Sequence, residues 1–306
     1  MERRARKGFG RLETERARPG LPPGDGPPAA SVRGILLAER RIHRALAGAA
    51  RNLGRIAAAF AAAIERGGRV IYAGAGTSGR LGALDAAEIP PTFGLAPSRV
   101  RAVLAGGGRA MRHAVEDAED DAAAGARAIS RAGTGRADLV IGISASGRTP
   151  FVEGALAAAR RLGADTALIA CVRRPALSRR ARVTAAIPVG PEVLAGSTRM
   201  GAGTATKIAL HAISTAAMAA IGRIYRGEMI GVRATNEKLR ARASRIVSRL
   251  AVVPPARARR LLAAVRGRVP EAILMGRFGI GPREAARRLS DAGTLAQALA
   301  DGSGIG

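Results

Sequence analysis

Apolar residues occur along this chain in two patterns, short continuous runs and a helical spacing of three to four residues. Short apolar runs bounded by Gly, Pro or polar residues predict five strands, at 69–76, 100–106, 138–144, 166–172 and 183–190. Apolar residues spaced three to four apart predict helices at 31–66, 78–88, 109–121 and 149–163, and a long helix from about Thr204. Pro90 and Pro91 are expected to end the second of these helices. Strands that alternate with helices predict βαβ units, and therefore an α/β fold with a doubly wound parallel sheet.

The pattern becomes purely helical beyond Gly231. A helix over about 235–250 and shorter ones near 256–266, 269–275 and 282–299 predict a small C-terminal helical domain, which we place at 232–306. The α/β domain is placed at 50–225, and 31–66 is an N-terminal helical segment. Residues 1–30 are basic and then dense in Pro and Gly, which predicts a flexible arm.

Composition narrows the class of protein. Of 306 residues, 47% are apolar, which is enough for a packed core. The net charge is +27, but Lys7, Lys207 and Lys238 are the only lysines, and the many Arg are spread from end to end. We interpret the charge as a compositional bias, with nucleic-acid binding as a weaker alternative. Aromatic residues make up 2% of the chain, which argues against a stacking platform for single-stranded nucleic acid.

Several function classes are disfavoured. A single Cys171 excludes an internal disulfide, and three scattered His make a metal site unexpected. The first residues contain no apolar run typical of a signal peptide, and no apolar stretch is long enough to span a membrane. We therefore expect a cytoplasmic protein with no metal and no membrane partner.

Two Gly-rich turns carry hydroxyl groups where a strand leads into a helix. The first, at 74–80 (GAGTSGR), contains Thr77 and Ser78; the second, at 144–150 (SASGRTP), places Thr149 as the N-cap residue before Pro150. Free N–H groups at helix N-termini bind anions. Neither turn has the spacing of a nucleotide-binding loop, so a sugar monophosphate is the favoured ligand. The alternative is that these hydroxyls only cap helices.

Carboxylates supply the candidate acid–base chemistry. Glu88 is expected in the last turn of its helix, where the helix dipole would raise its pKa and suit it to general-acid catalysis, unless it is a solvated helix end. In the acidic run 116–121, Glu116 and Glu119 are three apart, so either is a candidate to face inward. The loop at 190–207 contains Glu192 and Ser197 and either closes over a substrate or only connects two elements.

The chain resembles the N-acetylmuramic acid 6-phosphate etherases, which are built on the SIS (sugar isomerase) phosphosugar-binding fold. The resemblance covers most of residues 50–250. It rests on the segments GRVIYAGAGTSGRLGALDAAEIPPTFG (68–94), AGGGRAMRHAVEDAEDD (105–121), IGISASGRTPFV (141–152), GPEVLAGSTRMGAGTATK (190–207) and ATNEKLRARASRIV (234–247).

This resemblance implies a flavodoxin-like three-layer sandwich and a lyase that cleaves the D-lactyl ether of N-acetylmuramate 6-phosphate, in the recycling of cell-wall amino sugars. It implies no metal or organic cofactor and a homodimer, with the helix near 232–250 as a candidate to reach across. By motif position the catalytic carboxylates are Glu88 and Glu119, with Glu116 as the fallback. The substrate-binding residues it implies are Thr77, Ser78, Ser144, Ser146 and Thr149, to which the loop candidates Glu192 and Ser197 are added.

This sequence departs from the family pattern in three places. Gly201 stands where the family usually has Lys, His211 stands where it usually has Asn, and the N-terminal signature is reduced to TERARP at 14–19. If the missing Lys contacts the lactyl carboxylate, Arg199 is the candidate to replace it. These departures keep open a non-catalytic sugar-phosphate-binding regulator of the same fold.

Overall fold

The computed structural model describes residues 13, 16, 26–232 and 237–300. The flexible arm predicted at 1–30 is wrong for residues 28–30, which already belong to a helix, and most of the rest of the arm and of the TERARP segment lies outside the described residues. The described chain divides into two compact units, one formed by residues up to 87 with 98–216, the other by 88–97 with residues from 217 onward. The domain boundaries drawn from the sequence stay predictions.

The first unit contains a five-stranded, fully parallel sheet in the order β2-β1-β3-β4-β5. All five predicted strands are confirmed, each slightly shorter than its apolar run. The strands are β1 (Val70–Gly74), β2 (Val100–Leu104), β3 (Leu139–Ile143), β4 (Asp165–Ala170) and β5 (Val183–Ala186). The α/β class and the doubly wound parallel sheet are therefore confirmed.

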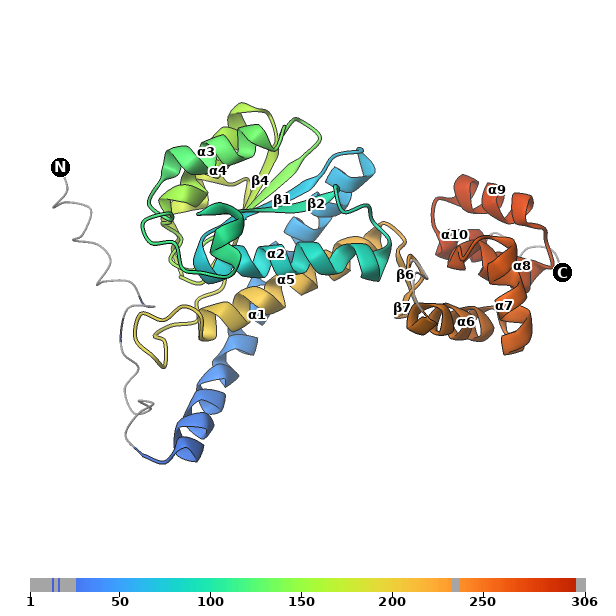
Figure 1. Cartoon of the computed structure of the whole chain (residues 1–306), viewed down its shortest axis with the longest axis horizontal. Coiled ribbons are helices and arrows are strands. Elements are labelled where there is room, and N and C mark those ends of the chain that lie inside the picture. Colours follow the sequence, from blue (N-terminus) through green and yellow to red (C-terminus); the bar gives the residue numbers. More distant parts are fainter. Residues whose placement is uncertain (1–12, 14–15, 17–25, 233–236, 301–306) are drawn as a thin grey trace. The chain divides into compact units, whose positions relative to one another are not determined.

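Helices cover both faces of this sheet (Figure 1). One layer is α3 (Ala122–Arg131) and α4 (Pro150–Arg161), which share a core cluster with alternate residues of the strands, such as Ile71, Val140 and Leu168. On the opposite face lie α1 (Pro28–Glu65), α2 (Gly76–Phe93) and α5 (Gly201–Ala220). The three central strands, β1, β3 and β4, are buried on both faces, which is why they read as continuous apolar runs.

The expectation that Pro90 and Pro91 end the second helix is wrong, because α2 continues through both to Phe93. Ile89 and Phe93 lie four residues apart on one side of this last stretch, and both are buried. Their packing offsets the two missing N–H groups, so burial outweighs local propensity here. Glu88 is consequently not in the last turn of α2, so the expectation that it lies at the helix C-terminus is wrong.

The predicted helix over 109–121 is also absent. A short 3-10 helix, η4 (Gly107–Met111), is followed by turns, and Asp117 adopts a positive φ of 60°. Asp121 is the N-cap of α3, where its Oδ1 accepts a hydrogen bond from Ala124 N at 2.7 Å. Asp is favoured at N-cap positions, so the acidic run precedes a helix that was not predicted. Glu116 and Glu119 do not share a helix face.

The second unit is mainly helical. It contains a short antiparallel hairpin of two strands, β6 (Ile224–Tyr225) and β7 (Glu228–Met229). Among the residues described there, five helices follow: α6 (Glu237–Ala251), α7 (Pro255–Ala264), α8 (Val269–Phe278), α9 (Pro282–Ala292) and α10 (Leu295–Ala300). Its core includes Ile246, Val247 and Ile273. The predicted C-terminal helices are confirmed, except that the last divides at Gly293, which has a φ of 77°.

Candidate functional site

The two hydroxyl-bearing turns follow neighbouring strands. β1 pairs in parallel with β3, and Gly74 lies opposite Ile143 in the register. The chain passes from β1 to β2 on one side and later to β3 on the other, so the edge between β1 and β3 is the topological switch point of the sheet. In open α/β sheets this is the place where ligands bind. The sheet therefore brings the two predicted phosphate turns together.

In the first turn, glycines let the chain bend tightly from β1 into α2. A Cβ on Gly74 would lie 2.7 Å from Gly79 N, and a Cβ on Gly79 would lie 2.0 Å from Leu104 Cδ1. Thr77 and Ser78 occupy the first turn of α2 and are half-buried. Within the described part of the chain, their hydroxyls have no hydrogen-bond partner. They are available to an anion at this helix N-terminus.

The second turn is held by its own side chains. Ser144 is buried, and its Oγ lies 2.8 Å from Thr149 Oγ1. Thr149 is the N-cap residue of α4 and Pro150 is its first residue, as predicted, but the Thr149 side chain makes no capping bond because it pairs with Ser144. Ser146 Oγ accepts a hydrogen bond from Arg148 N at 3.3 Å. The turn is thus ordered around the N-terminus of α4.

The loop before α5 contacts the first turn. A Cβ on Gly203 would lie 3.5 Å from Thr77 Cγ2 and 3.3 Å from Thr198 O, so the first residues of α5 pack against this turn. Ser197 is half-buried in the same loop, and its backbone closes a turn through Met200 N. Of the two interpretations left open for this loop, this contact favours a place beside the phosphate turns.

Glu192 has a structural task in this loop. Its side chain is fully buried, and its two carboxylate oxygens accept hydrogen bonds from Gly201 N at 2.9 Å and Ala202 N at 2.8 Å, at the start of α5. Burial raises the pKa of Glu192, although these N–H groups and Arg41 oppose the rise. A Cβ on Gly201 would lie 2.9 Å from Glu192 Oε2. The departure to Gly at 201 therefore leaves room for this carboxylate cap.

Glu119 is fixed beside the second turn. Its carbonyl oxygen accepts a hydrogen bond from Phe151 N at 2.9 Å, in the first turn of α4 and two residues after Thr149. Its side chain is exposed. Glu116 is exposed as well, but its carbonyl closes a local turn with Ala118 N instead. The backbone geometry thus favours Glu119 over Glu116 as the carboxylate near the turns.

Glu88 is exposed and lies ten residues after Ser78 along α2. A helix rises 1.5 Å per residue, so the two Cα atoms are separated by about 15 Å along the axis. Along α2, Glu88 is therefore not brought close to Ser78 in the first turn.

A polar cluster that the sequence did not reveal surrounds Asp85, one turn before Glu88. Asp85 accepts hydrogen bonds from Tyr72 Oη at 2.7 Å and Ser214 Oγ at 3.1 Å. Burial raises the pKa of Asp85, and both hydrogen bonds oppose the rise. His211 Nδ1 lies 3.0 Å from Lys207 Nζ on α5, and burial together with Lys207 lowers the pKa of His211. In the sequence, the only indication of this cluster was that a second acid, Asp85, stands three residues before Glu88 in the segment DAAE.

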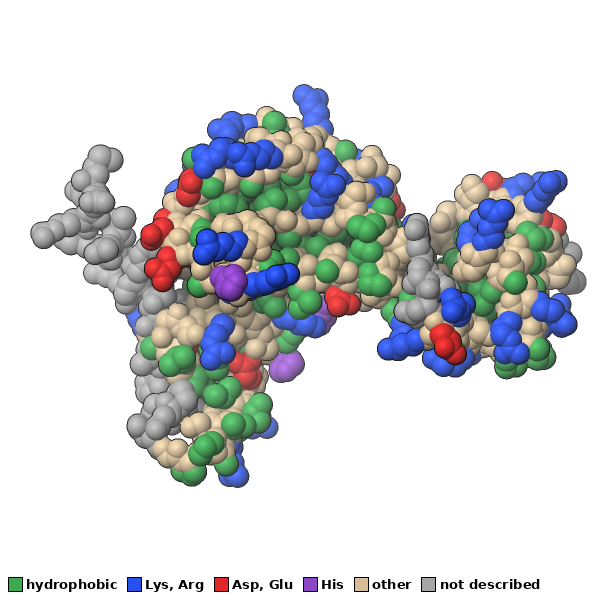
Figure 2. Space-filling view, viewed as in Figure 1, with side chains coloured by type: hydrophobic (Ala, Val, Ile, Leu, Met, Phe, Trp, Pro, Cys, Tyr) green, Lys and Arg blue, Asp and Glu red, His purple; other side chains and the backbone are tan. Residues whose placement is uncertain are grey.

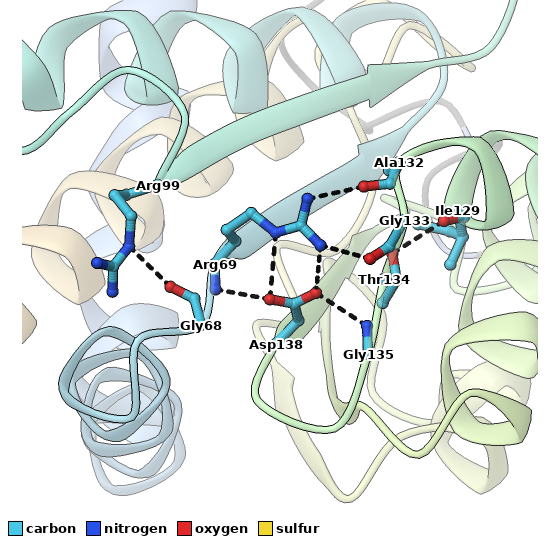
Figure 3. Close-up of polar contacts among 9 residues, drawn as sticks. All are labelled: Gly68, Arg69, Arg99, Ile129, Ala132, Gly133, Thr134, Gly135 and Asp138. Atoms are coloured by element: carbon cyan, nitrogen blue, oxygen red, sulfur yellow. Dashed lines mark hydrogen bonds and ion pairs between the residues drawn. The ribbon is translucent and has the colours of Figure 1, made fainter.

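A network of hydrogen bonds lies at the other end of the sheet, where β1 and β3 begin (Figure 3). Asp138, just before β3, accepts hydrogen bonds from the backbone N of Arg69 at 2.7 Å and from its guanidinium at 2.8 Å, and another from Gly135 N. Burial would raise the pKa of Asp138, but these bonds outweigh it and lower the pKa. The network joins the starts of β1 and β3, and so supports the register on which the two phosphate turns depend.

Among the described residues, no three His, Cys, Asp or Glu side chains come together in a way that could hold a metal ion. No helix in the same part of the chain is both long and apolar enough to cross a bilayer.

Known proteins agree with this architecture. A family model for the glucokinase regulatory protein N-terminal SIS domain matches residues 52–160. An N-acetylmuramic acid 6-phosphate etherase from Geobacillus thermodenitrificans is 52% identical over 76% of this chain and 78% of its own length. The etherase from Rubrobacter xylanophilus is 47% identical over 89% of this chain and 90% of its own. The chain belongs to the N-acetylmuramic acid 6-phosphate etherase family. Among solved structures, a phosphoheptose isomerase from Francisella tularensis is 17% identical, with a TM-score of 0.48 over 62% of this chain and 98% of that one.

Two departures from the family pattern, Gly201 and His211, lie at the start of α5 and beside Lys207. Neither position interrupts the two phosphate turns.

Proposed function

We propose that this protein cleaves the D-lactyl ether of N-acetylmuramate 6-phosphate, giving N-acetylglucosamine 6-phosphate and D-lactate. The observation that carries the proposal is the pair of hydroxyl-bearing turns at the β1/β3 switch point, in a chain 52% identical to an enzyme of that name. The reaction would take place in the cytoplasm and return cell-wall amino sugars to metabolism.

The phosphate group would bind at the two helix N-termini. Neutral hydroxyls and backbone N–H groups neutralise a phosphate there through the dipoles of α2 and α4. Glu192 takes part as a positioning residue, because it holds the start of α5 against the first turn. The residues proposed to contact the phosphosugar are Thr77, Ser78, Ser144, Ser146, Thr149 and Ser197.

The chemistry is an elimination followed by an addition. In the ring-opened sugar, a base removes the proton at C2, next to the aldehyde; the C3–O bond breaks, and an acid protonates the departing lactate oxygen. Water then adds to C3 of the unsaturated aldehyde, and C2 regains a proton. We assign the acid to Glu88 and the second carboxylate to Glu119, since the reaction needs one acid and one base.

A homodimer would reconcile Glu88 with this assignment. Glu88 is exposed and lies too far along α2 to act beside Ser78 of its own subunit. In a two-fold dimer the same surface of each subunit faces the other, so Glu88 of the partner subunit would complete each site. Leu84, 47% exposed one turn earlier on α2, is an apolar contact suited to such an interface.

The test is product analysis in water enriched in oxygen-18 and deuterium. Elimination and addition place the heavy oxygen on C3 of the sugar and deuterium on C2, and leave D-lactate without heavy oxygen. Heavy oxygen in lactate would contradict the mechanism. Binding of the phosphosugar without lactate release would favour the regulatory alternative.

A further inference from the structure

A large hollow lies entirely within the helical unit, apart from the phosphate turns. Its volume is about 1380 Å³. Three mutually packed helices, α6, α7 and α8, supply about half of its lining, which includes the buried apolar side chains Leu262 and Val269. Small-molecule sites usually occupy ~300–1,000 Å³, so this hollow is large enough for a metabolite.

Its lining is strongly basic. Two lining residues are acidic, Glu237 and Glu271, and Glu271 is already paired with Arg268 at 2.6 Å. The lining arginines are Arg223, Arg240, Arg245, Arg259, Arg266 and Arg268. Figure 2 shows that Lys and Arg also outnumber acidic side chains on the visible face of this unit.

Most of this charge is not neutralised within the protein. Arg240, Arg245, Arg259 and Arg266 make no ion pair or hydrogen bond through their side chains to any residue that the structure describes. Four arginines from two helices and the turn after α7 therefore line one hollow, and their exposed side chains are not paired with any described residue. Guanidinium groups bind phosphate through paired, charge-assisted hydrogen bonds.

The turn between α7 and α8 is built at a conformational cost. Arg266 has a φ of 53°, which non-glycine residues rarely adopt, while the next residue, Gly267, has a φ of 79°. Hydrogen bonds from Gly267 N to Leu262 O and from Arg268 N to Val265 O hold this turn. A strained residue retained on the rim of a hollow is typical of binding sites.

We propose that this hollow binds a small, non-aromatic molecule that carries two or more phosphate-type negative charges, at a site separate from the phosphosugar site. The number of unpaired guanidinium groups sets the charge of the ligand. The lining contains no Phe, Tyr or Trp, so nothing in it would stack on a nucleobase. A concave hollow also encloses a small molecule better than it fits the convex surface of a nucleic-acid duplex.

The experiment is calorimetric titration of the full chain with inorganic pyrophosphate, with inorganic phosphate for comparison. The test variant is Arg259→Gln with Arg266→Gln. The matched control is Arg257→Gln with Arg260→Gln, which removes the same charge from positions on α7 that do not line the hollow. We expect pyrophosphate to bind wild type and control equally and to lose at least about tenfold in affinity at one site in the test variant.

Equal titration curves for all three proteins would overturn the proposal. So would a 20-base-pair DNA duplex that binds through Arg259 and Arg266 when pyrophosphate does not. If the first test variant fails to fold, Arg240→Gln with Arg245→Gln on α6 removes two other guanidinium groups from the same hollow and must give the same loss.

Discussion

Ser144 Oγ and Thr149 Oγ1 lie 2.8 Å apart across the turn that joins β3 to α4. The hydrogen bond diverts Thr149 from capping its own helix, and in the first turn of α4 the Phe151 N–H is already bonded to the Glu119 carbonyl. In the proposed function, these two hydroxyl groups would contact the phosphate.

Replacing Ser144 by Ala should weaken phosphosugar binding. The variant loses one hydroxyl donor and frees Thr149 to cap α4, so we expect KM to rise about tenfold with a smaller change in kcat. Steady-state kinetics with N-acetylmuramate 6-phosphate measure this. Ser178→Ala, at an exposed serine in η5 (Ala176–Arg180), is the matched control and should behave as wild type. An unchanged KM for Ser144→Ala would remove this turn from the site.

Glu119 and Glu116 should differ sharply when each is replaced by Gln. The carbonyl of Glu119 is anchored to Phe151 N, whereas that of Glu116 is not tied to α4. We expect Glu119→Gln to lower kcat by about 10²–10⁴, as for loss of a general acid or base, and Glu116→Gln to stay near wild type. Since both side chains are exposed, thermal unfolding should be unaffected in either variant. The reverse ranking would assign the second carboxylate to Glu116.

Two inactive variants should restore activity when mixed, if Glu88 serves the partner subunit. Glu88→Gln and Glu119→Gln dimers are each expected to be inactive. After dissociation and reassociation, a heterodimer would have one site with both carboxylates intact, so an equal mixture should recover about a quarter of wild-type activity. Mixing Glu88→Gln with itself under the same conditions is the control. A mixture that stays inactive would exclude a site shared in this way.

Asp138→Asn should destabilise the α/β unit in a pH-dependent way. The carboxylate is buried and bonded to Arg69, so at neutral pH we expect a loss of about 2–4 kcal/mol in the free energy of unfolding. Its pKa in the folded protein is lowered, so the stabilisation is present above the ordinary Asp pKa of about 4 and is lost as the pH falls through the folded pKa.

Urea unfolding of Asp138→Asn and wild type at a series of pH values tests this sign. The two proteins should differ most above about pH 5 and converge in acid. Asp165→Asn is the control, because its ion pairs with Arg66 and Arg182 are largely exposed and are worth less than about 1 kcal/mol. A difference that grows in acid would contradict the assignment.

The sequence predicts the sheet well because its three central strands, β1, β3 and β4, are buried on both faces. Runs such as 138–144 have no polar alternation, and their spacing alone indicates a parallel α/β sheet. Local patterns fail where distant contacts decide the structure. α2 continues past two prolines because Ile89 and Phe93 are buried. Asp121, the last residue of the acidic run, is the N-cap of α3, so the rest of the run precedes that helix.

In the candidate site too, local features could be predicted from the sequence and long-range contacts could not. The turns containing Ser78 and Ser144 are recognisable from glycine and hydroxyl spacing, because their chemistry is local. The buried cap made by Glu192 and the cluster around Asp85 depend on residues far apart in the chain, and single-sequence patterns do not report such pairs.

The central claim is that this chain is a working etherase. Purified full-length protein incubated with N-acetylmuramate 6-phosphate, with D-lactate measured over time, tests it most directly. We expect D-lactate and N-acetylglucosamine 6-phosphate in equal amounts from wild type and neither product from Glu88→Gln. The absence of D-lactate from wild-type protein that still binds the phosphosugar would contradict it.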